Sequence, residues 1–179
     1  MFVRRYARRA SGGWIRHAAA LTAAGLIECC APGMADEALV TYRSISPDLA
    51  IEIAHAALQK CRDDGLQVAV VVLDRFGQPL VLLRDRFAGL PAASTASAKA
   101  YTSLSFRLST ADFVTAIQGR QLNPELGRMP NIVMLAGGVP IEAGGGLVGA
   151  IGVSGAPGGD KDEACARAGL DAVQDRLDF

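Results

Sequence analysis

Two apolar runs joined by a tight turn constrain the fold of this chain most strongly. Residues 66–73 are rich in valine, residues 78–84 are rich in leucine, and the turn Asp74-Arg75-Phe76-Gly77 separates them. Runs of this length with a glycine-containing turn between them predict two antiparallel strands. Because the first run is almost continuously apolar, we expect helices to cover both faces of the sheet.

Three further strands are expected near the C-terminus, where short apolar segments alternate with glycines. They span residues 131–136, 139–142 and 147–153 and are separated by Gly137-Gly138 and Gly144-Gly145-Gly146. Together with the hairpin they predict a five-stranded, mostly antiparallel sheet. Within the last strand, Gly149 and Gly152 are expected to let another segment pack closely against the backbone.

Four helices are expected around this sheet. Ser46 is a favourable N-cap, Pro47 suits the first helical position, and Gly65 suits the end of the first helix. Asp160 and Glu163 have the spacing of a capping box at the start of the last helix. The expected helices span residues 46–65, 94–106, 110–118 with Thr110 as the cap, and 160–177. The order of helix, hairpin, two helices, meander and helix predicts an α+β fold with helices packed on the sheet.

The N-terminal segment has the order of an export signal. Five arginines between residues 4 and 16 precede an apolar run over residues 18–27, and small residues follow at Gly33-Met34-Ala35. The apolar run is about half the length that a membrane-spanning helix needs. We therefore expect a signal peptide over residues 1–35, a mature domain over residues 36–179, and a periplasmic or secreted protein. A twin-arginine route, lipidation at Cys29 or Cys30, and a cytosolic protein with a misassigned start codon remain open as alternatives.

The charge of the expected mature domain limits its partners. Without residues 1–35 the chain keeps 13 basic and 17 acidic residues, a net charge of −4. A mildly acidic domain without a basic run predicts neither a nucleic-acid partner nor a membrane partner for the mature form.

Cysteine and histidine are scarce in the mature domain. Cys61 and Cys165 are its two cysteines, and His55 is its single histidine. These numbers exclude a zinc cluster within one chain. Two buried thiols are favoured over a disulfide between Cys61 and Cys165, although pairing stays open in an oxidising compartment. Any haem ligand or metal ligand of the histidine type must be His55.

Hydrolytic and nucleotide-binding motifs are missing from the sequence. The glycine-rich residues 144–159 lead into Asp160-Lys161-Asp162-Glu163, where carboxylates would oppose a phosphate. We interpret these carboxylates as helix-capping groups, and no Gly-x-Ser-x-Gly elbow is present. The sequence therefore predicts no catalytic residue. Lys99 lies in an Ala/Ser-rich segment with Tyr101 and Arg107, where a lysine either reaches the surface or binds an anion.

Several short motifs together resemble the GlcG/HbpS haem-binding family, which also occurs as a module fused to some PduO-type cobalamin adenosyltransferases. The resemblance rests on Val70-Val-Val-Leu-Asp74 followed by Gly77, on Lys99-Ala-Tyr-Thr102, on Gly137-Gly-Val-Pro-Ile141, and on Gly149-Ala-Ile-Gly-Val-Ser-Gly155 leading into Asp160-Lys-Asp-Glu163 and Ala166-Arg-Ala-Gly169. It implies a single domain with an antiparallel sheet, a homo-oligomer, and haem binding as in some members. Some members are exported, and others are cytosolic neighbours of glycolate or diol metabolism.

The resemblance also implies where haem would bind. Residues 87–93 lack the histidine or Met-Asp pair that relatives often carry there, which leaves His55, Tyr101, Met129 and Met134 as candidate ligands. Of these, His55 is the usual strong axial ligand. We therefore expect haem at a surface or subunit interface, with His55 as the iron ligand and Lys99 or Arg107 near the propionates.

Two other functions stay open at this point. One is an enzyme or accessory factor that acts on a small organic acid or a tetrapyrrole through Lys99 and the loop of residues 154–160. The other is a non-catalytic oligomeric scaffold.

Overall fold

The computed structural model describes residues 39–178, and Thr41–Phe179 form one compact unit. Its helices are α1 (Pro47–Asp63), α2 (Ala92–Phe106), α3 (Thr110–Gln118) and α4 (Gly159–Asp171), with short 3-10 turns η2 (Pro124–Arg128) and η3 (Gln174–Arg176). Its strands are β1 (Ala69–Asp74), β2 (Pro79–Arg84), β3 (Gly138–Ala143) and β4 (Gly146–Ser154). The expected signal-peptide boundary lies outside the described residues. No described helix is long and apolar enough to cross a membrane.

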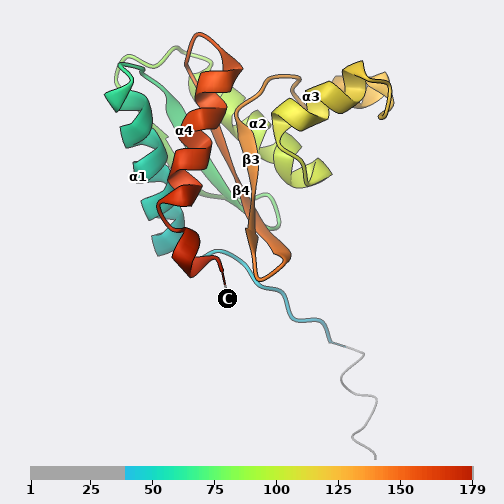
Figure 1. Cartoon of the computed structure of the whole chain (residues 1–179), viewed down its shortest axis with the longest axis horizontal. Helices are drawn as coiled ribbons and strands as arrows, with labels where there is room; N and C mark the ends of the chain where they lie inside the picture. Colours follow the sequence, from blue (N-terminus) through green and yellow to red (C-terminus); the bar gives the residue numbers. More distant parts are fainter. Residues whose placement is uncertain (1–38, 179) are drawn as a thin grey trace, which may run out of the picture. The chain divides into compact units, whose positions relative to one another are not determined.

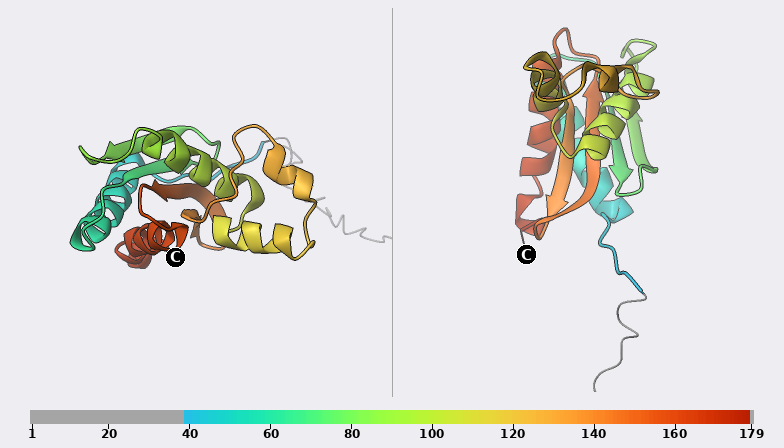
Figure 2. Two further views of the ribbon diagram at one scale, coloured as in Figure 1. Left: turned by 90° about the horizontal axis from the view of Figure 1, so that it is seen from above. Right: turned by 90° about the vertical axis from the view of Figure 1, so that its right-hand side faces the viewer.

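The strands form one antiparallel sheet in the order β2-β1-β4-β3. Successive side chains of a strand point to opposite faces, so β1 contributes to two cores. Val70 and Val72 pack in the core with α1 and α4, whereas Ala69 and Val71 pack in the core with α2. Figures 1 and 2 show this three-layer arrangement. The expected α+β fold with helices on both faces is confirmed.

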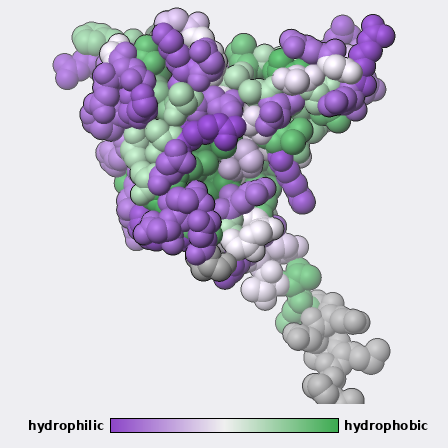
Figure 3. Space-filling view, in the orientation of Figure 1, coloured by the Kyte–Doolittle hydropathy of each residue, from purple (hydrophilic) through white to green (hydrophobic). Residues whose placement is uncertain are grey.

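Hydrophilic side chains cover the solvent side of the helices. The face that α4 turns to solvent is largely hydrophilic (Figure 3), whereas its buried residues face α1 and the sheet. α1 is amphipathic in the same way, with its small apolar residues buried. The helices therefore cover most of both faces of the sheet, although β2 keeps Leu82 half exposed.

The prediction of a fifth strand over residues 131–136 is wrong. The described part of the chain has four strands, and residues 131–136 pack as an irregular segment. Gly137 has a φ of +122° and its carbonyl accepts a hydrogen bond from Val153 N–H at 2.9 Å, so the β3–β4 ladder ends there. Before that point the side chain of Thr102, and not a neighbouring strand, accepts a bond from Val133 N–H. An apolar run in the sequence does not show that its backbone N–H groups bond to a side chain and not to a neighbouring strand.

The first helix begins and ends as expected. Ser46 Oγ accepts a hydrogen bond from Leu49 N–H at 3.3 Å, and Pro47 is the first helical residue. Gly65, with a φ of +73°, follows the last turn. These end signals are local, which explains why they could be found in the sequence.

Three expected features of the other helix ends are wrong. Ser109, not Thr110, caps α3, because Ser109 Oγ accepts from Asp112 N–H while Thr110 Oγ1 accepts from Gly138 N–H on β3. α4 has no capping box, since Gly158 is its N-cap and Glu163 pairs with Arg167. α4 also ends at Asp171, before the expected residue 177.

A glycine in β4 sets the distance between α2 and the sheet. A Cβ atom at Gly152 would lie 2.0 Å from the Ala96 carbonyl oxygen of α2. Any side chain there would push the helix away from the sheet. The close approach expected at this position is confirmed.

A disulfide bond joins α1 to α4, contrary to the two separate thiols that the sequence favoured. Cys61 and Cys165 are fully buried, and their Cα atoms are 5.6 Å apart. The helices approach closely because Gly169 of α4 lies against the backbone of α1, where a Cβ would be 2.7 Å from Ile53 O. The separation of 104 residues along the sequence hides this proximity.

Replacement of both cysteines by alanine should lower the free energy of unfolding by about 2–5 kcal/mol. Without the disulfide, the unfolded chain is no longer closed into a long loop, so its conformational entropy rises and unfolding becomes more favourable. Urea unfolding of the oxidised protein and of the Cys61→Ala/Cys165→Ala variant measures the difference. The oxidised protein treated with reductant serves as a control that leaves the side-chain volume unchanged. Equal midpoints for all three samples would contradict the expectation.

Candidate functional site

Lys99 is a buried residue whose side chain forms an ion pair with a distant part of the chain. It projects from α2, and its Nζ atom lies 2.6 Å from Asp162 Oδ2 of α4 and 3.0 Å from the Val153 carbonyl oxygen. Only 2% of Lys99 is exposed. The structure therefore places Lys99 away from the surface, where its ammonium group forms an ion pair with the Asp162 carboxylate.

Asp162 links this ion pair to the loop before α4. Its Oδ1 atom accepts a hydrogen bond from Ala156 N–H at 3.0 Å. Burial raises the pKa of the Asp162 carboxyl, while the hydrogen bonds from Lys99 and Ala156 act in the opposite direction. The pair thus fixes α2, the end of β4 and the start of α4 relative to one another.

Tyr101 lines a shallow hollow beside the β1–β2 turn, which we call the Tyr101 hollow. Its volume is about 380 Å³, and its walls are mainly apolar. The lining residues are Leu73, Gly77, Pro79, Ser94, Ser97, Ala98, Tyr101 and Asn131. Tyr101 is 40% exposed, which makes it one of the exposed large hydrophobic residues of the described chain.

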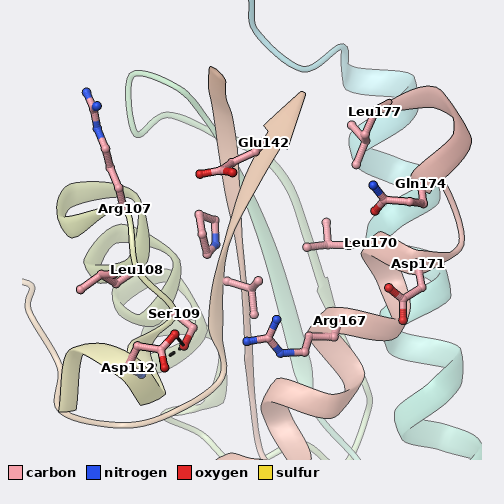
Figure 4. Close-up of a pocket in the computed structure, with 12 residues that line it drawn as sticks. Arg107, Leu108, Ser109, Asp112, Glu142, Arg167, Leu170, Asp171, Gln174 and Leu177 are labelled. Carbon is pink, nitrogen blue, oxygen red and sulfur yellow. Dashed lines mark hydrogen bonds between the residues drawn. The ribbon is translucent and has the colours of Figure 1, made fainter. Parts of the chain in front are cut away.

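Arg107 lines a different hollow of about 440 Å³, which we call the Arg107 hollow. Figure 4 shows Arg107, Ser109 and Asp112 on the side of α2 and α3, with α4 opposite and β3 between them. Apolar side chains of β3 and α4, such as Val139 and Leu170, form part of the wall. The lining also includes Arg167 and three carboxylates, Asp112, Glu142 and Asp171, so the hollow is mixed in charge and more polar than apolar.

His55 lies on the exposed side of α1, close in sequence to the exposed side chain of Ile51. α1 packs on one face of the sheet, whereas α2, which carries Tyr101, packs on the other. The structure therefore separates His55 from Tyr101 by the thickness of the sheet, whereas Arg107 lies at the β3 edge, in a hollow that β3 and α4 help to line. The four candidate residues do not form one site within a single chain, and the described residues contain no group of three or more potential metal ligands.

Two contributors to these features were missed from the sequence. Asp162 was interpreted only as a capping group, and Arg167, which lines the Arg107 hollow, was not considered. Both lie in the segments quoted for the family resemblance. Their spacing within α4 could have assigned each of them to a face of that helix. It could not show that these faces meet α2 and α3, because that depends on the topology of the fold.

Comparisons with known proteins agree on one family. The family model described as "Haem degrading protein HbpS-like" matches residues 45–171. An uncharacterized 15.0 kDa protein of Citrobacter freundii from the dhaT-dhaS intergenic region is 30% identical over 126 residues, which cover 69% of this chain and 88% of that protein.

Solved structures show the same fold. A double mutant of Streptomyces reticuli HbpS is 34% identical with a TM-score of 0.72, over 88% of this chain and 99% of that chain. The PduOC:heme complex is 23% identical with a TM-score of 0.66, over 72% of this chain and 94% of that chain. At that identity the second likeness concerns the fold alone.

Breaking the Lys99–Asp162 pair should destabilise the protein strongly. Lys99→Met or Asp162→Asn alone leaves a buried charge without its partner, which costs about 3–5 kcal/mol of unfolding free energy. The Lys99→Met/Asp162→Asn double variant should lose clearly less than the sum of both, and urea unfolding of all four proteins measures this coupling. Lys60→Met, which breaks the exposed Lys60–Asp64 pair, is the control and should cost at most about 1 kcal/mol. Strict additivity of the two single losses would contradict a coupled buried pair.

Proposed function

Because this chain belongs to the HbpS-like family, we propose that it is an exported protein that binds haem. The observation that carries the proposal is the family match over residues 45–171, which includes all four strands and all four α-helices of the described chain. The family description concerns haem, and a relative of the same fold is known as a haem complex. The exposed donor groups of this chain give the proposal a chemical basis.

The residues present suit haem. A haem site needs an axial donor, apolar contacts and cations near the propionates. The chain offers the exposed imidazole of His55, the phenol of Tyr101 in a mainly apolar hollow, and the guanidinium of Arg107. Bound haem supplies an iron centre whose behaviour depends on its axial ligand and surroundings.

His55 is the axial ligand in this proposal. It is the single imidazole among the described residues, and imidazole is a stronger haem ligand than phenol or thioether in most settings. Neither hollow described above includes His55, so haem on α1 needs a second surface to cover it. We therefore propose a site between subunits, in which His55 of one copy holds the iron.

Arg107 is the better placed of the two expected propionate partners. Lys99 already binds Asp162 inside the protein, so its ammonium is not available to a ligand. Arg107 lies at the β3 edge of the sheet, whereas α1, which carries His55, packs over β1 and β2, so Arg107 could approach a haem on His55 only from another copy. The buried position of Lys99 likewise gives no support to an enzyme that uses this lysine on a small acid.

Export is the second part of the proposal. The arginine-rich start, the apolar run and the small residues before Asp36 support a signal peptide. The disulfide between Cys61 and Cys165 supports an oxidising compartment, because cytosolic thiols are normally kept reduced. A periplasmic or secreted location agrees with both.

A haemin titration of residues 36–179, followed by visible absorbance, tests the proposed function. We expect a saturable Soret shift that weakens at least tenfold in His55→Ala, because the variant lacks the strong axial donor. Tyr101→Phe is the matched control, since it removes the other accessible donor and should leave the shift unchanged. Equal affinity of His55→Ala and the parent protein would exclude His55, and loss of the shift in Tyr101→Phe would move the ligand to the Tyr101 hollow.

Expression of the full chain in a Gram-negative host tests export. The periplasm or medium should contain a chain that starts at Asp36, give or take a few residues, with Cys61 and Cys165 oxidised. N-terminal sequencing and thiol titration check both points. A chain that keeps residues 1–35 and stays in the cytosol with free thiols would contradict the proposal.

A further inference from the structure

The Arg107 hollow combines apolar surface with charged groups from several elements. It lies over β3, with α2 and α3 on one side and α4 on the other (Figure 4). Leu108, Val139 and Leu170 give it apolar surface, and charged side chains reach it from both sides and from β3 itself. A ligand of this hollow can therefore make ionic and apolar contacts at the same time.

An added β-strand does not suit this hollow, although β3 is an edge strand of the sheet. The Gly138 N–H is already bound by Thr110 Oγ1 at 2.8 Å, and Pro140 has no N–H. β3 therefore lacks two of the donors that an added strand would need. A ligand of the hollow must be held mainly by side chains.

Three charged groups of the hollow have no partner in the part of the chain that the structure describes. Arg107 is exposed at the end of α2, Glu142 is exposed on β3, and Asp171 is exposed at the end of α4. None of their side chains makes a hydrogen bond or an ion pair with another described residue. These three groups are free to bind a ligand.

The other two charged residues of the lining are already compensated. Arg167 donates to Glu163 Oε1 from Nε at 3.0 Å and from Nη2 at 2.5 Å. Asp112 accepts a hydrogen bond from the Ser109 hydroxyl at 2.8 Å and lies in the first turn of α3, where the helix dipole favours a negative charge. The unpaired groups of the hollow are therefore one cation and two anions.

These three groups are spread across the hollow. In Figure 4, Glu142 turns its carboxylate to the side of Arg107, whereas Asp171 lies on α4, beyond Leu170. Arg107 and Glu142 can thus bind a carboxylate and an ammonium group that share one carbon atom, and Asp171 can bind a second cation at the far end of an alkyl chain. Val139 and Leu170 supply the apolar contacts for such a chain.

We propose that the Arg107 hollow binds a free basic α-amino acid such as lysine. Arg107 binds its α-carboxylate, Glu142 its α-ammonium group and Asp171 its side-chain cation. The ligand carries two cations and one anion, and the hollow offers two unpaired anions and one unpaired cation. This site uses neither His55 nor iron, so it goes beyond the proposed function.

Related ligand classes match the hollow less well. A diamine brings two cations and leaves Arg107 without an anion, whereas an amino acid with an apolar side chain leaves Asp171 without a cation. A residue within a peptide lacks the free α-ammonium and α-carboxylate groups that Glu142 and Arg107 require. The volume of about 440 Å³ is within the usual range of small-molecule sites.

Isothermal titration calorimetry of the purified, haem-free protein tests the ligand class. L-lysine should bind saturably at one site per chain. Cadaverine, which lacks the carboxylate, and L-norleucine, which lacks the side-chain ammonium, should each bind at least tenfold more weakly, because each loses one charged hydrogen bond. No saturable binding of L-lysine at millimolar concentration, or equal binding of all three compounds, would overturn the proposal.

Two variants assign the ends of the ligand. Arg107→Gln should abolish the preference for lysine over cadaverine and keep the preference over norleucine, and Asp171→Asn should do the reverse. Arg86→Gln, which changes an exposed arginine outside the hollow, is the matched control and should keep both preferences. Equal melting temperatures show that each variant folds. Preferences that persist unchanged in both hollow variants would overturn the assignment.

A His55→Ala variant separates this inference from the proposed function. It should bind lysine as the parent protein does, because α1 contributes no residue to the hollow. The titrations use haem-free protein because the proposed function assigns Arg107 to a haem propionate. Lysine binding without a Soret shift on addition of haemin would support this inference and refute haem binding. Haem binding through His55 in a protein that does not bind lysine would refute this inference alone.

Discussion

A lysine that is removed from water needs a carboxylate close by, and this requirement governs how the two helical layers meet the sheet. Lys99 starts on α2 and Asp162 starts on α4, which pack on opposite faces, and their bond passes the end of β4. The cost of burying either charge alone is several kcal/mol, so the layers are held at the spacing that keeps Nζ and Oδ2 together. The loop before α4 follows from the same bond, because Asp162 also accepts from Ala156 N–H.

The parts of the fold that could be predicted are those with local causes. The hairpin of β1 and β2 follows from two apolar runs and a glycine turn, and the start of α1 follows from Ser46 and Pro47. Residues 131–136 look like a strand because they are apolar, but Thr102 binds Val133 N–H where a strand partner would have been needed. The disulfide was not found because the approach of Cys61 and Cys165 depends on how α1 and α4 pack.

The candidate residues illustrate the same distinction at the level of the site. Chemical type alone could single out His55, Tyr101 and Arg107, but it could not show that the sheet lies between His55 and Tyr101, or that Arg107 lies at the β3 edge. The sequence singled out Lys99 as a residue that could bind an anionic ligand, but the anion that it binds in the structure is the carboxylate of Asp162. A periodic pattern assigns a residue to a face of its own helix, whereas the neighbour of that face depends on contacts far away in the sequence.

Pro140 and the Thr110–Gly138 bond have a consequence for the behaviour of the protein at high concentration. Growth of cross-β fibrils requires that every strand added leaves a new receptive edge. A sheet with one edge closed in this way cannot propagate, so any association through the remaining edge stops when that edge is used. Pro140, which has no N–H, and the Gly138 N–H, which Thr110 Oγ1 binds, therefore limit the addition of further strands at the β3 edge, while Leu82 is exposed on β2 at the other edge.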